Sequence, residues 1–417
     1  MEKQNIFIIG AGIVGISCAL HLQQRGYRVT LADPRGLAGG ASYGNAGVLA
    51  SSECLPLATP ELIKQLPSLL LNKNSPLTLR WLYAPRMLDW FYRFMQSAKP
   101  EKITYAAEHL SLLLEQSVAA HRQLAEAAQY SGRILPTGWI KAFEREETYR
   151  SAQADFRMME KYGVRCDYMD AATLQEQQPN LAPIFKHAVN NSDCCQIINP
   201  GDYVQQLGAS FLANGGKLIL TEIESLETRN GIVVSANSQT EKYQADAFVV
   251  AAGAWSKKLS RDTGTYIPLD TERGYHIELE AEDSRLASAP VFWAEQSVVM
   301  SPGGGKLRVT SSVEFAGLHR KADFTKLSSQ IKEIRRSHRA SLGQVRAQWL
   351  GFRPSIPDSM PVIGKAARAD NAFLAFGHGH LGLTLGPITG QIIADLVDNK
   401  TPDLNLTPYS PQRFTSR

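Results

Sequence analysis

Three glycines near the start of the chain have the spacing Gly-x-Gly-x-x-Gly, at positions 10, 12 and 15. They follow an apolar run at 6–9 that is typical of a buried strand, and they precede a stretch with helical spacing. Gly10 permits a tight turn, Gly12 lets the backbone approach a pyrophosphate at the helix N-terminus, and Gly15 lets helix and strand pack closely. We therefore expect this segment to bind the phosphates of a dinucleotide.

An acidic residue, Asp33, closes the second short strand of this unit, where its carboxylate can accept hydrogen bonds from a ribose diol. Pro34 and Arg35 follow it and are expected to contact the same nucleotide. The dinucleotide could be NAD or FAD. An NAD domain would repeat its strand–helix–strand units directly, whereas this chain enters a loop of small residues at 39–49 and then a long insertion. Such a loop allows close backbone approach to a ligand, which favours FAD.

Composition limits the remaining classes of protein. The chain has 417 residues, 44% of them hydrophobic and 20% charged, with a net charge of +4. These values allow two or three domains, exclude a disordered or collagen-like chain, and give no reason to expect nucleic acid as a partner. Five cysteines without ligand spacing predict reduced thiols and no metal site. We expect neither a secretory signal nor a membrane-spanning helix, and therefore a cytoplasmic protein.

Elements typical of a nucleotide-binding fold occur in three separated parts of the chain. The pattern predicts strands at 217–220, 232–235, 248–253 and 372–376, and helices at 103–130, 149–162, 199–212, 324–340 and 384–397. We expect an α/β fold (α+β overall), in which a Rossmann-type FAD-binding domain is interleaved with a substrate domain built on a mixed or antiparallel sheet. The FAD-binding domain would comprise 1–54, 196–264 and 346–417. The substrate domain would comprise 55–195, with a helical insertion, and 265–345.

Four blocks in this order resemble the D-amino-acid oxidase and glycine oxidase superfamily of flavoproteins, and within it the bacterial FAD-dependent D-amino-acid dehydrogenases. The blocks are the N-terminal glycine motif, 41–47 (Ala-Ser-Tyr-Gly-Asn-Ala-Gly), 251–256 (Ala-Ala-Gly-Ala-Trp-Ser), and Arg353-Pro354 to Gly364 followed by 377–382 (Gly-His-Gly-His-Leu-Gly). They span nearly the whole chain. Their number and order are specific for the superfamily, and less specific for the substrate.

The resemblance implies a set of cofactor contacts. The flavin ring would lie along the loop from Ser42 to Val48, the adenine end near Ile223, and the pyrimidine edge near 379–384. The expected cofactor-binding residues are Gly10, Gly12, Ile13, Val14, Gly15, Asp33, Pro34, Arg35, Ala41, Ser42, Asn45, Ala46, Gly47, Val48, Ile223, Ala252, Gly253, Trp255, Gly379, His380, Leu381, Gly382, Leu383 and Thr384. Some relatives attach FAD covalently to a C-terminal cysteine or to a histidine of this loop. Here no cysteine follows Cys195 and Gly44 occupies the loop position, so non-covalent FAD is expected.

The expected helix after Leu381 has a physical role in this site. Reduced flavin carries negative charge near N1 and the C2 carbonyl. The free N–H groups at a helix N-terminus, here those of Leu381 to Thr384, can stabilise that charge. An ordinary glycine-rich turn before a surface helix is the alternative interpretation.

The implied reaction is hydride transfer from Cα of an amino acid to flavin N5, in which the protein supplies orientation and electrostatics. Arg353 matches the family's carboxylate-binding arginine, since a guanidinium can bind a carboxylate through two parallel hydrogen bonds. His380, Tyr275 and His276 are the other expected catalytic residues. Relatives also use a tyrosine three residues before a Pro-Arg pair, whereas residues 299–303 here read Val-Met-Ser-Pro-Gly. This departure resembles the branch that acts on D-proline-type substrates, including hydroxy-D-proline.

Residues 77–99 combine aromatic residues with arginines, which fits either an interfacial membrane patch or a helical pair buried against the substrate domain. Dehydrogenases of this family pass electrons to a membrane quinone, so a patch at the inner face of the membrane would have a use. Two other classes remain open. One is an oxygen-using amine oxidase of the sarcosine or glycine type, and the other is a flavin-binding electron relay without its own turnover.

Overall fold

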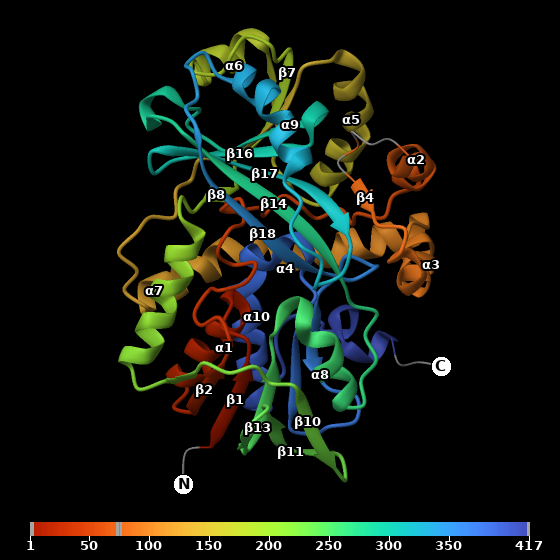
Figure 1. The fold of residues 1–417 in the computed structure, drawn as a ribbon, viewed down its shortest axis with the longest axis vertical. Coiled ribbons are helices and arrows are strands. Elements are labelled where there is room, and N and C mark those ends of the chain that lie inside the picture. Colours follow the sequence, from red (N-terminus) through yellow and green to blue (C-terminus); the bar gives the residue numbers. More distant parts are fainter. Residues whose placement is uncertain (1–3, 72–74, 76, 415–417) are drawn as a thin grey trace.

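Two large β-sheets, one above the other along the long axis, organise the molecule (Figure 1). The computed structural model describes residues 4–71, 75 and 77–414. One sheet has six strands and carries the glycine motif, and the other has nine strands. The expected fold class, a Rossmann-type unit interleaved with a domain built on a mixed sheet, is confirmed.

The six-stranded sheet has the order β19-β20-β13-β1-β2-β9 and is parallel except for β19, which pairs antiparallel with β20. Its strands are β1 (Asn5–Ile9), β2 (Arg28–Ala32), β9 (Lys217–Ile219), β13 (Ala247–Val250), β19 (Val362–Lys365) and β20 (Ala372–Phe376). Residues 6–9 are buried because both faces of the sheet are covered. This explains why the sequence shows a continuous apolar run and no alternation.

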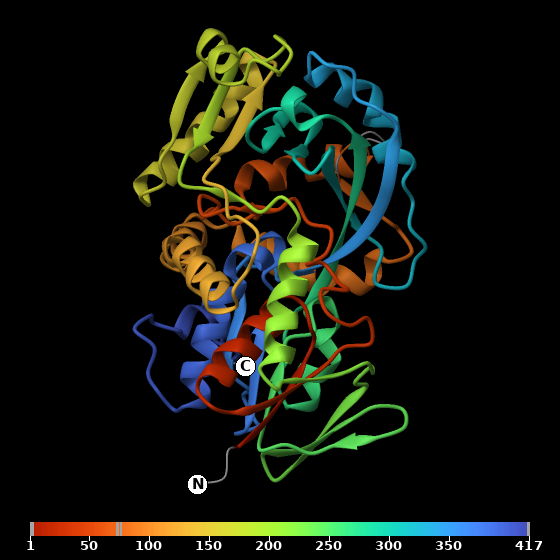
Figure 2. The same ribbon diagram turned by 90° about the vertical axis from the view of Figure 1, so that its left-hand side faces the viewer.

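The nine-stranded sheet has the order β18-β14-β17-β16-β15-β5-β7-β6, with β4 pairing on β17. Its strands are β4 (Leu77–Leu79), β5 (Trp139–Phe143), β6 (Asp167–Asp170), β7 (His187–Asn191), β14 (Asp270–Glu280), β15 (Val291–Trp293), β16 (Val298–Pro302), β17 (Lys306–Phe315) and β18 (Val345–Ser355). The pairs β15–β5 and β17–β4 are parallel and the others are antiparallel. Figure 2 shows residues 139–191 (yellow) at the end of this sheet farthest from β18.

Smaller strands and the helices cover these sheets. The remaining strands are β3 (Val48–Leu49), β8 (Cys195–Gln196), β10 (Ser225–Arg229), β11 (Ile232–Asn237) and β12 (Lys242–Tyr243). The α-helices are α1 (Ile13–Gln24), α2 (Pro60–Leu71), α3 (Leu88–Ser97), α4 (Pro100–Ala127), α5 (Glu146–Lys161), α6 (Ala171–Gln177), α7 (Pro200–Ala213), α8 (Ser256–Asp262), α9 (Thr325–Ile334) and α10 (Gly382–Val397). None of the helices in the part of the chain that the structure describes is long and apolar enough to cross a bilayer.

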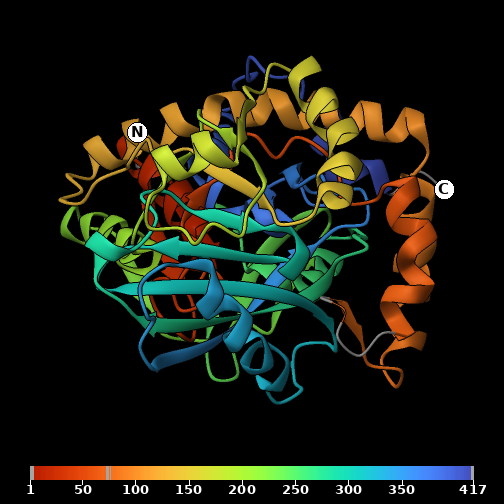
Figure 3. The same ribbon diagram turned by 90° about the horizontal axis from the view of Figure 1, so that it is seen from above.

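Two elements join the sheets across the predicted domain boundaries. The long helix α4 runs along one side of the molecule (orange in Figure 3), and most of its buried apolar residues belong to the same core as α1 and α10. Strand β18 pairs with β14 over nearly its whole length, although most of it falls within the segment 346–417 that we expected in the FAD-binding domain. Arg353 therefore belongs to the nine-stranded sheet, at the end of β18 from which the chain returns to the six-stranded sheet.

Candidate active site

A cavity of about 680 Å³ extends from the glycine motif to the nine-stranded sheet. Its walls include Gly10 and Gly12 from the six-stranded sheet, Arg353 from β18, and apolar side chains from α2 and α3. Most of the expected cofactor-binding residues line it. These are Gly10, Gly12, Ile13, Val14, Asp33, Arg35, Ala41, Ser42, Asn45, Ala46, Val48, Ala252, Gly253, Trp255, Gly379, His380, Leu381, Gly382 and Leu383.

The turn after β1 leaves no room for side chains. Gly10 has φ +110°, and a Cβ on it would lie 2.3 Å from the carbonyl oxygen of Ala251. A Cβ on Gly15 would lie 1.9 Å from the carbonyl oxygen of Gly10, so α1 packs directly on this turn. Gly15 does not line the cavity, which fits the packing role expected for the third glycine of the motif.

Two side chains organise the backbone beside this turn. The carboxylate of Asp33 is 9% exposed and accepts hydrogen bonds from the backbone N–H groups of Ala11 (3.0 Å) and Arg35 (2.9 Å). The Ser42 hydroxyl accepts one from the N–H of Ile13 (2.9 Å), in the first turn of α1. These bonds tie β2 and the loop at 39–49 to the N-terminus of α1.

Four other expected cofactor residues, namely Pro34, Gly47, Ile223 and Thr384, also do not line the cavity. The Thr384 hydroxyl accepts a hydrogen bond from the N–H of Ala50 (3.0 Å) and so holds Ala50, which does line the cavity, in place. A Cβ on Gly47 would meet the carbonyl oxygen of Ile197 at 2.2 Å, so this glycine is required by backbone packing.

Three side chains of the nine-stranded sheet bind consecutive carbonyl groups of the loop at 39–49. His276 Nδ1 lies 2.7 Å from the oxygen of Gly44, Arg308 donates to that of Asn45 (3.1 Å), and the Ser301 hydroxyl donates to that of Ala46 (2.7 Å). The His276 ring stacks on Trp349, and burial lowers its pKa to about 4. His276 does not line the cavity; it fastens the loop that does.

The expected carboxylate-binding residue, Arg353, is partly buried on the cavity wall. Its guanidinium lies over Gly274, where a Cβ would come within 2.4 Å of its atoms, and it donates one hydrogen bond to the carbonyl of Ser312 (3.1 Å). No acidic side chain of the described residues forms an ion pair with it. Burial lowers its pKa, and the charge of Glu272 opposes that effect. Most of the donors of this guanidinium thus remain available to a ligand.

Glu272 is the residue of this wall that sequence reasoning missed. It is 3% exposed, lines the cavity and lies opposite Arg353 in the β14–β18 ladder. Its carboxylate lies 2.9 Å from His380 Nε2 and accepts a hydrogen bond from the Ser355 hydroxyl (2.6 Å). Its position within a strand that is otherwise buried could have indicated a role in the site, because a glutamate is rarely buried without a partner.

The other expected catalytic residues are placed as follows. Tyr275 lines the cavity, and its hydroxyl donates to Glu314 (2.5 Å), which also pairs with Arg80 and Arg273. His378, which was not among the expected catalytic residues, is 3% exposed, and its Nε2 lies 2.9 Å from the hydroxyl of Thr389. The structure thus brings Arg353 and His380 together around Glu272.

These walls fit a flavin dinucleotide. The glycine turn can accept a pyrophosphate only because no Cβ is present, and the fastened loop exposes small residues along the middle of the cavity. The chain matches the protein family described as FAD dependent oxidoreductase (DAO) over residues 5–396. The chain belongs to this family. FAD is therefore its cofactor.

Relatives of this FAD-dependent oxidoreductase match over almost their whole length. A D-amino-acid oxidase of Bradyrhizobium diazoefficiens is 35% identical over 427 residues, which cover 99% of this chain and 99% of that protein. A D-amino acid dehydrogenase 2 of Ralstonia nicotianae is 30% identical, covering 98% of this chain and 100% of that protein. The crystal structure of glycine oxidase from Geobacillus kaustophilus shares the fold, with a TM-score of 0.77, 21% identity and 99% of each chain covered.

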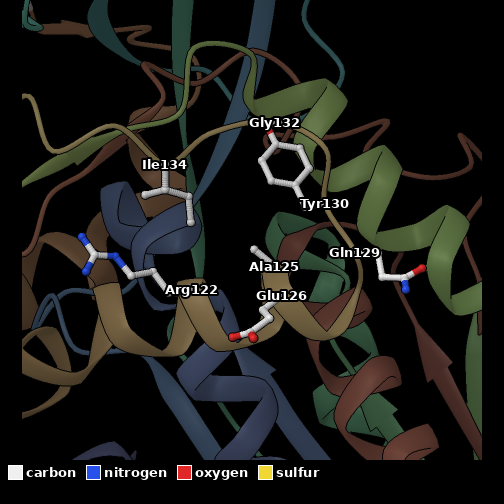
Figure 4. Close-up of a pocket in the computed structure, with 7 residues that line it drawn as sticks. All are labelled: Arg122, Ala125, Glu126, Gln129, Tyr130, Gly132 and Ile134. Carbon is white, nitrogen blue, oxygen red and sulfur yellow. The ribbon is translucent and has the colours of Figure 1, made fainter.

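A second hollow, of about 250 Å³, lies at the end of α4 and shares no lining residue with the flavin cavity. Figure 4 shows it between α4, which contributes Arg122 and Glu126, and the following loop, whose Tyr130 ring packs on Tyr203. Across residues 4–71, 75 and 77–414, no group of three or more His, Cys, Asp or Glu could hold a metal ion.

Proposed function

We propose that this FAD-dependent oxidoreductase oxidises D-amino acids at the Cα–N bond and passes the electrons to a quinone-type acceptor. FAD, bound non-covalently, supplies the hydride acceptor N5. The observation that carries the proposal is the partly buried guanidinium of Arg353, which lines the cavity without an ion-pair partner among the described residues. A cation of this kind is suited to a substrate carboxylate, because two parallel charge-assisted bonds can form.

The roles of the other side chains follow from their contacts. Arg353 holds the carboxylate, and His380, beside it on the cavity wall, faces the substrate amine. Tyr275 forms part of the same wall, where its bond to Glu314 holds it. His276 keeps the loop at 39–49, here called the flavin loop, in place. The preference for D-isomers is inferred from the names of the relatives, which are a D-amino-acid oxidase and D-amino acid dehydrogenases.

Within this class, the proposed substrates are D-proline and hydroxy-D-proline. Support comes from residues 299–303, where the tyrosine and arginine used by related enzymes are replaced by Val299 and Gly303. Oxidation of a secondary amine would give a cyclic imine, whereas a primary amine would give an imine that hydrolyses to a keto acid.

The acceptor and the membrane contact rest on the segment 77–99. Met87, Trp90 and Phe94 are buried against Phe315, so the expected helical core is present in part. Other apolar side chains of the same segment are exposed. These are Trp81 (65% exposed), Leu82 (96%), Leu88 (69%), Tyr92 (59%) and Met95 (48%). We assign this group to a peripheral contact with the inner face of a membrane, where quinone is available to a cytoplasmic enzyme. Liposome flotation of the wild type, compared with a Trp81→Ser, Leu82→Ser variant, tests the assignment.

An anaerobic absorbance titration tests the reaction. The yellow protein is mixed with paired D- and L-isomers of proline, 4-hydroxyproline and alanine, and with sarcosine. Bleaching by D-isomers alone is expected, and bleaching by sarcosine or L-proline would move the enzyme to the amine-oxidase class. If none of these amines bleaches the bound flavin, the electron-relay class is correct.

Reoxidation of the reduced enzyme identifies the acceptor class. We expect slow reoxidation by air and fast reoxidation by a soluble quinone analogue. Fast reoxidation by air alone would favour the oxygen-using amine oxidase.

A further inference from the structure

The carboxylate of Glu272 lies at the junction of three elements on the cavity wall. Glu272 belongs to β14, Ser355 to β18, and His380 to the short 3₁₀ turn Gly379–Leu381 that leads into α10. The Ser355 hydroxyl bonds one carboxylate oxygen (2.6 Å), and His380 Nε2 lies 2.9 Å from the other. Both oxygens are therefore oriented by groups from outside their own strand.

Glu272 is ionised in this setting. Burial opposes the charged form, but the bond and charge of His380, the bond from Ser355 and the charge of Arg353 outweigh it and hold the pKa of the carboxyl below its usual range. Charged groups face the pair from two strands, Asp270 from β14 and Arg353 from β18. His378, which precedes the same turn, is bonded to Thr389 and does not join the pair.

An ionised Glu272 determines which nitrogen of His380 carries the proton. A carboxylate only accepts hydrogen bonds, so Nε2 must be the donor and the lone pair of neutral imidazole must reside on Nδ1. Within the described residues Nδ1 has no hydrogen-bond partner, and the His380 side chain is 40% exposed where it meets the cavity. A basic nitrogen thus lies on the wall that also holds Arg353.

We propose that Glu272 is a positioning residue that holds His380 as the acceptor for a proton of the substrate ammonium group. This inference rests on the proposed function, because it concerns an amino acid whose carboxylate is bound by Arg353. The amino acid would enter as a zwitterion. One ammonium N–H bond breaks, its electron pair stays on the substrate nitrogen, and the proton forms a new bond to Nδ1 of His380.

This transfer precedes oxidation for a chemical reason. The bond between Cα and its hydrogen can break as a hydride only when the nitrogen lone pair is free to form the C=N bond. The imidazolium that results is stabilised by the adjacent Glu272 carboxylate. The exposed side of the ring can then return the proton to solvent.

Nuclear magnetic resonance of protein with isotope-labelled histidine tests the transfer directly. The probe ligand is 2-aminoisobutyrate, which has a carboxylate and an ammonium but no hydrogen on Cα, so it cannot be oxidised. At pH 8 we expect its binding to convert His380 to imidazolium, while benzoate, which lacks an amine, leaves the ring neutral. His380→Asn assigns the resonance. A ring that stays neutral with 2-aminoisobutyrate bound would overturn the proposal.

The pH profile of flavin reduction by the D-amino acid that bleaches the enzyme gives a second test. In Glu272→Gln the acid limb should move down by about one pH unit, because the imidazolium loses its counter-charge, and the rate at pH 8 should fall about tenfold. His380→Asn should lower that rate about a hundredfold and abolish the limb. The matched control is Glu280→Gln, in the same strand but paired with Arg346 at the surface, which should change neither quantity.

Two outcomes separate this proposal from the proposed function. If D-amino acids reduce the flavin but Glu272→Gln keeps the wild-type pH profile, the role of Glu272 is wrong and the function stands. If no D-amino acid reduces the wild type and neither ligand binds, both are wrong. Should Glu272→Gln fail to fold, Ser355→Ala removes one bond to the carboxylate and should give a smaller shift in the same direction.

Discussion

The two ends of the large cavity have walls of different composition. Around Gly10 the wall consists of backbone, and a ligand can approach it closely because no side chain projects there. Around Arg353 the wall is made of side chains from β14, β17 and β18, and it works because they meet in a specific cross-strand register. In the proposed function, the first end binds the cofactor, whose phosphates need little more than N–H groups and space. The second end would distinguish one small substrate from another, which requires side chains.

The largest expected effect comes from filling the backbone end. Gly10→Ala would place a Cβ against the Ala251 carbonyl at a positive φ, so we expect loss of FAD and a decrease of about 3 kcal/mol in the free energy of unfolding. Flavin absorbance and urea unfolding measure both. The control is Gly163→Ala, at φ +82° with no atom near the added Cβ, which should cost about 1 kcal/mol and keep the flavin. A yellow, stable Gly10→Ala protein would contradict the comparison.

Acid should weaken the connection between the two ends. Buried His276 remains neutral until about pH 4, whereas in the unfolded chain it takes a proton near its ordinary pKa of 6.5. The unfolded state therefore binds more protons between these values, and stability falls as the pH drops from 6.5 to 4. This one group contributes about 3 kcal/mol across that window.

Urea unfolding at pH 7, 5.5 and 4.5 measures this loss. His276→Gln should show a smaller decrease with acid than the wild type, while His319→Gln, at an exposed position, should match the wild type. Equal pH dependence in wild type and His276→Gln would show that His276 does not contribute to the acid sensitivity of the fold.

Removing the guanidinium should separate substrate binding from cofactor binding. Arg353→Ala should retain FAD but bind benzoate about a hundredfold more weakly, because two charge-assisted bonds are lost. Arg346→Ala, at the surface in the same strand, is the control. Spectral titration with benzoate gives the dissociation constant. Loss of FAD, or unchanged binding, would contradict the assigned role.

The smallest expected effect is at the junction of α1 with the flavin loop. Ser42→Ala leaves the N–H of Ile13 without its acceptor and should lower the free energy of unfolding by about 1 kcal/mol, with FAD still bound. Ser151→Ala, on exposed α5, should change it by less than about 0.5 kcal/mol. A loss of several kcal/mol in Ser42→Ala would mean that this side chain does more than accept the hydrogen bond from Ile13.

The backbone end could be predicted from the sequence because its parts are local. The strand, the turn with Gly10, the helix and Asp33 lie within 33 residues, and each is specified by its own neighbours. The helix after Leu381 was also expected, although it begins two residues earlier than the pattern indicated. The helix begins directly after the 3₁₀ turn Gly379–Leu381, and the spacing of apolar residues does not predict that turn.

At the end of the cavity around Arg353, the sequence predicts only residues that belong to a recognisable motif. Arg353 was expected from its block. Glu272 belongs to no such motif, and its place in the site follows only from the strand register that sets it opposite Arg353. Tyr275 and His276 were expected in the site, whereas Glu272, three residues before Tyr275, was not. His276 was expected to be catalytic, and the structure instead bonds it to Gly44, a contact across 232 residues that no local pattern indicates.

The bonds from His276, Arg308 and Ser301 to the flavin loop also bear on modularity. Three side chains of one sheet bind successive carbonyl groups in a loop that belongs to the other. A chimera that combined this cofactor unit with the catalytic sheet of a relative would break all three bonds unless the loop were exchanged as well. Recombination within the family should therefore succeed at cross-over points that keep residues 39–49 with β14–β17, and fail at those that separate them.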